Sequence, residues 1–137
     1  MFDALDFLDL SQNEFTGILP SSVFDIPVIR LIYLNNNRFE GGIPSNFANA
    51  ASLRDLYLGT NLLTGEIPSI MPGQLVNLNE FLVHENSLRG EMPASICSLI
   101  VPAGELEDLW ADCAEVNGAI EVQCTCCTQC SDFPPFS

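Results

Sequence analysis

The sequence predicts an α/β-type repeat solenoid of about four repeats, closed at its C-terminal end by a cysteine-rich cap. Two observations lead to this prediction. A pattern of eight positions, most of them apolar, recurs four times along the chain. All six cysteines lie at or after Cys97, where the pattern fades. With 137 residues, of which 47% are hydrophobic, the chain can bury a core and forms at most one domain.

The repeat unit begins with the spacing Leu-x-x-Leu-x-Leu and ends with proline. The first unit comprises Leu5, Leu8, Leu10, Asn13, Phe15, Gly17, Leu19 and Pro20, and equivalent units begin at Ile29, Leu53 and Leu78. A fifth unit begins at Leu106, but Ala114 stands where the asparagine should be. We therefore expect repeats over 1–105, and a degenerate last repeat with the cap over 106–137. One unit cannot bury its own apolar face, whereas stacked units bury a continuous core.

Each position of the unit has a physical role. The two later leucines alternate with outward-facing residues, which predicts a short strand with one buried face. The asparagine follows where the chain turns inward, and its amide can bond backbone groups that no strand ladder pairs. The glycine permits a backbone conformation that a Cβ disfavours, and the proline begins a return segment on the outside of the coil. The asparagines of the predicted ladder are Asn13, Asn37, Asn61 and Asn86.

This unit resembles the leucine-rich repeat of the plant-type subclass, with its signature Leu-Thr-Gly-x-Ile-Pro. Residues 63–68 match the signature in full, and the other three units carry close variants. The resemblance covers roughly residues 1 to 113. It implies a right-handed curved solenoid with a parallel β-sheet on its concave side and short 3₁₀ or irregular segments on its convex side. It also implies recognition of other molecules, because plant-type repeats occur mostly in receptor ectodomains, receptor-like proteins and secreted inhibitors.

The cysteines predict a disulfide-stapled cap. The candidates are Cys97, Cys113, Cys124, Cys126, Cys127 and Cys130. Their even number favours disulfides, but many pairings are possible, and the adjacent Cys126 and Cys127 should reach different partners. A zinc site is the alternative, although zinc sites usually use two separated Cys-x-x-Cys pairs and only one is present. Disulfides would place the protein in an oxidising compartment: the extracellular space, the cell surface or an organelle lumen.

The two ends of the chain differ in their resemblance to known proteins. Residues 109–113 and 124–130 are similar to the ending of leucine-rich repeat proteins of unicellular algae such as diatoms. At the N-terminal end, the family's cap with paired cysteines is absent from the sequence. We therefore expect the first coil to be uncovered unless further residues or another subunit pack on it. The start of the chain also lacks the basic residue and apolar run of a signal peptide.

The register of the repeats predicts three columns of side chains on the concave face. The central column is Asp9, Tyr33, Tyr57, Leu82 and Trp110, one flanking column is Phe7, Leu31, Asp55, Glu80 and Asp108, and the other is Ser11, Asn35, Gly59, His84 and Asp112. Outward aromatic side chains are enriched at binding hot spots, although cross-strand aromatic pairs can simply stabilise a sheet. The predicted ligand-binding residues are Tyr33, Tyr57, Leu82, Trp110, Asp55, Glu80, His84 and Asp108. The single histidine is either a pH-sensitive contact beside acidic neighbours or an ordinary surface residue.

The charge balance limits the partners. The chain has 18 acidic and 4 basic side chains, which gives a formal net charge of -14. Such a surface repels phosphate, so we expect neither nucleic acid nor anionic lipid as a partner. No stretch is long enough for a transmembrane helix. The acidic column is by default a solvated face, and the sharper hypotheses are a basic peptide partner or a weak Ca²⁺ contact.

We therefore expect a non-catalytic recognition module that binds a protein or peptide through its concave face and needs no cofactor. No nucleophile can be matched to His84, and the carboxylates lie on an open face rather than in a cleft that excludes water, so no enzymatic activity is expected. Two alternatives stay open. One is an accessory subunit or fragment of a larger assembly, held through the uncovered first coil. The other is binding of a glycan or of ice.

Overall fold

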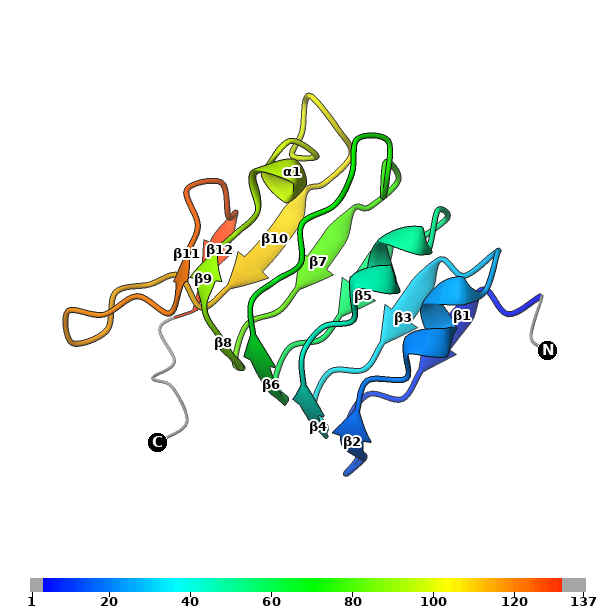
Figure 1. The fold of residues 1–137 in the computed structure, drawn as a ribbon, viewed down its shortest axis with the longest axis horizontal. Coiled ribbons are helices and arrows are strands. Elements are labelled where there is room, and N and C mark those ends of the chain that lie inside the picture. Colours follow the sequence, from blue (N-terminus) through cyan, green and yellow to red (C-terminus); the bar gives the residue numbers. More distant parts are fainter. Residues whose placement is uncertain (1–3, 132–137) are drawn as a thin grey trace.

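Six short parallel strands form the main sheet of the computed structural model, which describes residues 4–131 (Figure 1). In order across the sheet they are β1 (Phe7–Asp9), β3 (Leu31–Tyr33), β5 (Asp55–Tyr57), β7 (Glu80–Leu82), β10 (Asp108–Ala111) and β12 (Gln129–Cys130). Each strand pairs in parallel with its neighbour. The predicted leucine-rich repeat solenoid with a parallel sheet is confirmed, and we call the outward side of this sheet the concave face.

The return segments on the opposite side are short helical turns. Two of them are the 3₁₀ helices η1 (Ser21–Asp25) and η2 (Ser45–Asn49), and the fourth coil has one turn of α-helix, α1 (Ala94–Cys97). A proline directly precedes each of these turns. Proline suits this place because its φ is fixed and the first N–H groups of a helix have no intrahelical partner to lose. The predicted short convex segments are therefore present.

A second sheet differs from the prediction, which expected only turns and return segments in this part of the unit. It consists of β2 (Thr16–Ile18), β4 (Arg38–Gly41), β6 (Leu62–Gly65) and β8 (Ser87–Leu88), and a separate pair joins β9 (Gly90–Glu91) to β11 (Val122–Gln123). The signature glycines in these segments have φ between 78° and 91°. That left-handed conformation favours glycine, which confirms the role predicted for it. The strands are too short, at two to four residues, for a sequence pattern to reveal them.

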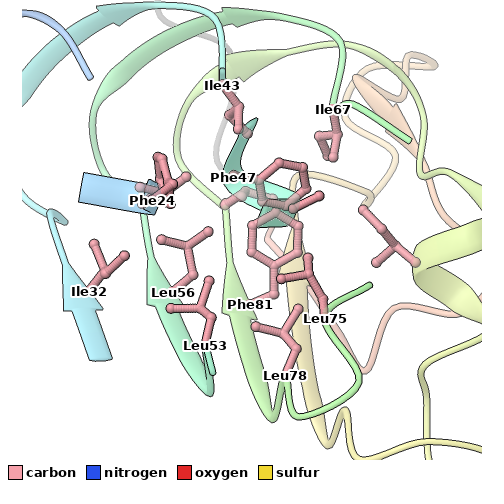
Figure 2. Packing of buried hydrophobic residues seen from close by; sticks show 14 of the residues in the cluster. Phe24, Ile32, Ile43, Phe47, Leu53, Leu56, Ile67, Leu75, Leu78 and Phe81 are labelled. Atoms are coloured by element: carbon pink, nitrogen blue, oxygen red, sulfur yellow. The ribbon is translucent and has the colours of Figure 1, made fainter. Parts of the chain in front are cut away.

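The core runs continuously from coil to coil beneath the main sheet. Figure 2 shows Phe47 and Phe81 facing each other at its centre, with leucine and isoleucine side chains around them. The rings of Phe47 and Phe81 are stacked with centroids 5.9 Å apart, and Phe24 meets Phe47 edge-on at 6.5 Å. All three phenylalanines are fully buried. Phe24 and Phe47 belong to the first and second repeats and Phe81 to the fourth, so the aromatic contacts tie different repeats together.

The asparagines at the turns join each coil to the one before it. The amide nitrogens of Asn37, Asn61 and Asn86 donate to the carbonyl oxygens of Leu10, Leu34 and Leu58 at 2.8, 3.0 and 3.0 Å. Their side-chain oxygens accept from the backbone N–H groups of Phe15, Phe39 and Leu63 at 3.1, 3.1 and 3.0 Å. All three side chains are buried. Asn13 is exposed, and the hydrogen bonds of its side chain to described residues stay within its own coil.

Three disulfides hold the C-terminal cap. They join Cys97 to Cys126, Cys113 to Cys130 and Cys124 to Cys127. The first of these links attaches the cap to α1, at the end of the fourth coil. Among the described residues no cysteine is free, and no helix is long and apolar enough to cross a membrane.

The position of Asp112 differs from the prediction, which placed it in the third column. It was expected on the concave face, but it is only 3% exposed. Its carboxylate accepts from the backbone N–H groups of Glu85 and Asn86 at 2.7 and 3.1 Å. In the earlier coils the equivalent N–H groups, those of Asn36 and Asn37, donate instead to backbone carbonyls of the next coil. Asp112 therefore turns inward because it replaces the carbonyls that a further regular coil would supply.

Candidate ligand-binding face

The strand register places two columns of side chains side by side on the concave face. Asp9, Tyr33, Tyr57, Leu82 and Trp110 are direct cross-strand neighbours, and so are Phe7, Leu31, Asp55, Glu80 and Asp108. Seven of the eight predicted ligand-binding residues lie on β3, β5, β7 or β10, and His84 follows β7. All eight are half-buried. They thus form one continuous surface, partly accessible and partly held by their neighbours.

Aromatic rings cover the N-terminal half of this surface. The Tyr33 and Tyr57 rings are stacked with centroids 4.3 Å apart and planes 10° apart. Phe7, which the prediction left out of the ligand-binding residues, meets Tyr33 edge-on at 5.2 Å and is 45% exposed. Packing of this kind stabilises adjacent coils and also holds the rings in a fixed position.

The tyrosine hydroxyls point toward the acidic column. The Tyr57 hydroxyl donates to Glu80 Oε1 at 2.8 Å, and the Tyr33 hydroxyl donates to Asp55 Oδ2 at 3.5 Å. Burial, with Glu80 beside it, raises the pKa of Tyr57 well above its ordinary value. Because both phenol protons are used within the face, this part of the surface offers mainly hydrogen-bond acceptors to a partner.

Burial, together with neighbouring like charges, makes the acidic column sensitive to pH. Burial raises the pKa of the Glu80 carboxyl, and Asp55 raises it further. A carboxyl whose pKa is higher in the folded than in the unfolded state favours folding when it is protonated, and this contribution is lost as pH rises through the folded pKa.

We therefore expect Glu80→Gln to be neutral at pH 7, or to raise the free energy of unfolding by about 0.5 kcal/mol, since it removes a like charge from the column. Glutamine keeps an acceptor for the Tyr57 hydroxyl. Urea unfolding at pH 7 and at pH 4 measures the effect. The gain should vanish at the lower pH, where glutamate is itself protonated. A loss of stability at pH 7 would mean that the charge strengthens the Tyr57 bond more than its neighbours oppose it.

A second pair of rings lies toward the C-terminal end of the face. His84 and Trp110 are stacked with centroids 3.5 Å apart and planes 12° apart. On its other side the imidazole lies against Gly59, where an added Cβ would be 2.6 Å from His84 Cε1. Gly59 was predicted to lie in this flanking column, with no role of its own. The structure shows that the missing side chain leaves room for His84.

The described residues contain no group of three or more His, Cys, Asp or Glu side chains placed to hold a metal ion. The acidic column, where the sequence suggested a weak Ca²⁺ contact, therefore contains no such group within the described residues. Two open hollows lie outside the columns, one beside Pro68, Gly90 and Pro93 and the other beside Arg30 and Arg54. The concave face itself is an open surface, which suits an extended partner better than a small enclosed substrate.

The comparisons with known proteins agree with this architecture. The family model described as Leucine Rich Repeat matches residues 4–26 and 29–50, which are the first two coils. The chain is a leucine-rich repeat protein. Its repeats are of the plant type, with a disulfide-rich C-terminal cap, as the sequence predicted. Comparison with the curated proteins gave no significant match.

Three solved leucine-rich repeat structures illustrate the similarity. The ectodomain of the Arabidopsis receptor kinase HAESA, in complex with an N-terminally extended IDA peptide hormone, is 36% identical over 69% of this chain and 16% of that chain, with a TM-score of 0.63. The plant peptide hormone receptor RGFR1, in complex with RGF2, is 29% identical over 80% of this chain and 17% of that chain, with a TM-score of 0.72. The BIR2 ectodomain from Arabidopsis thaliana is 33% identical over 69% of this chain and 50% of that chain, with a TM-score of 0.65. This chain therefore spans half or less of each of these proteins.

Proposed function

We propose that this leucine-rich repeat chain is a non-catalytic recognition module that binds a protein or peptide segment across its concave face. The observation that carries the proposal is the continuous row of half-buried aromatic and acidic side chains in strand register over β3, β5, β7 and β10. Prepositioned aromatic side chains bind with little loss of side-chain freedom and are enriched at hot spots. Similarity to receptors that were solved with bound peptide hormones supports the same reading.

The chemistry of the face favours a positively charged segment. The chain carries a formal net charge of -14, and Asp55, Glu80 and Asp108 are adjacent across the strands. The tyrosine hydroxyls already donate to these carboxylates, so a partner must bring its own hydrogen-bond donors. An arginine or lysine side chain supplies both the donors and the opposite charge.

The disulfides of the C-terminal cap indicate the kind of compartment in which the protein would bind its partner. Three disulfides are expected to form and persist in an oxidising environment and to be rare in the cytosol. We infer that the module works outside the cell, at the cell surface or in an organelle lumen.

Selection from a library of random displayed peptides tests the proposal. We expect the chain to enrich peptides that contain arginine or lysine, and Tyr57→Ala to weaken the capture of an enriched peptide by roughly tenfold or more, the loss expected at a hot spot. The matched control is Thr64→Ala, an exposed side chain of the same coil on β6 of the other sheet. It should leave capture unchanged, and circular dichroism should show both variants folded.

The outcomes separate the two parts of the proposal. If no peptide is enriched, the chain is not a peptide-recognition module. If the enriched peptides lack basic residues, recognition stands and the cationic partner is wrong. Equal effects of Tyr57→Ala and Thr64→Ala would place the binding surface elsewhere.

The first coil favours a second candidate, an accessory subunit of a larger assembly. Phe7 and Phe15 are each 45% exposed, and the inter-coil bonds made by the later asparagines have no counterpart at Asn13 among the described residues. This edge could therefore receive another coil of similar type. In that case Phe15→Ser would abolish assembly measured by analytical ultracentrifugation, whereas Tyr57→Ala would leave it intact. Ice or glycan binding gains no comparable support, since residue types change from rung to rung of each column.

A further inference from the structure

His84 closes over Trp110 at the C-terminal half of the concave face. The two rings are nearly parallel at 3.5 Å, which places the imidazole against one face of the indole. The other side of the imidazole rests against Gly59, because the backbone there has no Cβ to occupy the space. One face of Trp110, predicted as an exposed anchor, is therefore covered by a side chain of the preceding coil.

The closed arrangement suits only an uncharged imidazole. His84 Nδ1 is buried and has no hydrogen-bond partner within the described part of the chain. A neutral imidazole can leave Nδ1 as an unprotonated acceptor, but an imidazolium has an N–H on both nitrogens. The additional N–H would be buried without an acceptor, and burying an unpaired donor opposes folding into that geometry. Trp110 Nε1 is likewise buried without a partner in the described residues, so the indole N–H also lacks a hydrogen bond in this arrangement.

The charged groups around His84 are few. Glu85 is next to it on the same turn, and the buried carboxylate of Asp112 lies after β10. Both favour the imidazolium, but both are engaged elsewhere: Glu85 accepts from the Thr60 hydroxyl at 2.8 Å, and Asp112 accepts from two backbone N–H groups. On the Gly59 side the imidazole meets uncharged backbone. Glu121, whose pKa is raised by burial and by Asp112, belongs to the same acidic region of the cap.

We propose that His84 is a pH-operated cover of Trp110, which lies closed on the indole when neutral and swings out to solvent when protonated. Opening exposes the face of Trp110 beside Leu82 and so adds an aromatic anchor to the concave face in acidic surroundings. This consequence for binding rests on the proposed function, whereas the movement itself is a property of the chain alone and is tested without a partner.

The direction of the pH effect follows from the environment. Burial lowers the pKa of His84 below its ordinary value of 6.5, although Glu85 and Asp112 act in the opposite direction. Because the pKa of His84 is lower in the closed state than in the open one, the neutral imidazole favours closure. This preference is complete above pH 6.5 and is lost as pH falls. The cover therefore opens below the pH at which a free histidine titrates.

The chain carries its own probes, since it has a single histidine and a single tryptophan. NMR of the His84 ring protons follows its titration, and Trp110 emission with acrylamide quenching follows exposure of the indole. We expect His84 to titrate below pH 6.5 and, over the same pH range, Trp110 emission to shift to longer wavelength. Quenching should rise to the level of His84→Ala, in which nothing covers the indole.

Two further variants isolate the cover from other titrating groups. His84→Phe keeps a ring over Trp110 but cannot be protonated, so its emission should stay constant where the unmodified chain changes. Gly59→Ala pushes the imidazole away and should show the open emission already at pH 8. Titration of His84 at or above 6.5 would overturn the proposal, as a cation–π contact would then hold the charged ring closed. So would quenching of Trp110 that does not change while His84 titrates.

Discussion

Asn61→Ala is expected to lower the free energy of unfolding by about 3 kcal/mol, since it removes several buried hydrogen bonds at once. The side chain is 2% exposed, its amide donates to the carbonyls of Leu34 and Leu58 at 3.0 and 3.1 Å, and its oxygen accepts from the N–H of Phe39 at 3.1 Å. Alanine leaves the buried N–H of Phe39 without this acceptor, while the carbonyls of Leu34 and Leu58 each lose one donor and keep another, from the amides of Asn37 and Asn86. Equilibrium unfolding in urea, followed by circular dichroism, measures the loss.

The matched control is Asn13→Ala, the same substitution at the same position of the first coil. Asn13 is exposed, and within the described part of the chain its side-chain amide donates only to Leu10 and Ser11 of its own coil. Water can replace those bonds, so we expect a loss of about 1 kcal/mol or less. If the two substitutions cost the same, the bonds between coils do not contribute to stability and the ladder is a passive consequence of stacking.

Phe47→Ala is expected to be the most destabilising core substitution of the two middle coils, at about 4 kcal/mol. Phe47, of the second repeat, is fully buried and contacts Phe24 of the first repeat and Phe81 of the fourth (Figure 2). Alanine would open a cavity between three coils and remove both aromatic contacts. Thermal and urea unfolding should show a lower midpoint with a similar slope, because the same surface is exposed on unfolding.

Phe15→Ala provides the control for ring loss without burial. Phe15 is 45% exposed at the first coil and stacks on Phe39 at 6.3 Å. We expect it to cost about 1 kcal/mol, consistent with a partly exposed aromatic pair. A loss at Phe15 as large as that at Phe47 would show that the first coil, rather than the middle of the solenoid, limits the stability of the whole chain.

The residues that form the columns of the concave face were predictable from the sequence. The conformations and contacts of their side chains were not. Strand alternation and a repeat of 24 or 25 residues are enough to bring Tyr33 beside Tyr57 and Asp55 beside Glu80, because parallel strands of equal coils align residue by residue. The stacking of the two tyrosines, their hydrogen bonds to the acidic column and the cover of His84 on Trp110 depend on rotamers. Rotamers are chosen by neighbours that come from other coils, and a periodic pattern holds no information about them.

Asp112 and the second sheet illustrate the same limit. The repeat register placed Asp112 outward, and the structure turns it inward because no regular coil follows to pair with Glu85 and Asn86. A repeat pattern describes the interior of a solenoid, while an end must satisfy the groups that the next coil would have paired. The short strands of the second sheet likewise form only when neighbouring coils lie alongside, so two to four residues of local sequence could not reveal them.

The sequence by itself determined the solenoid, the residues of the two strand columns and the asparagine and glycine of the turns. Each of these follows from periodicity and from the conformational needs of single residues. Only the tertiary structure decided the disulfide partners, the inward orientation of the Asp112 side chain and the stacking of His84 on Trp110. These features depend on side chains that are distant in the sequence and meet only after the coils have stacked. Packing and the pairing of buried hydrogen-bonding groups then select one arrangement from the several that the sequence allows.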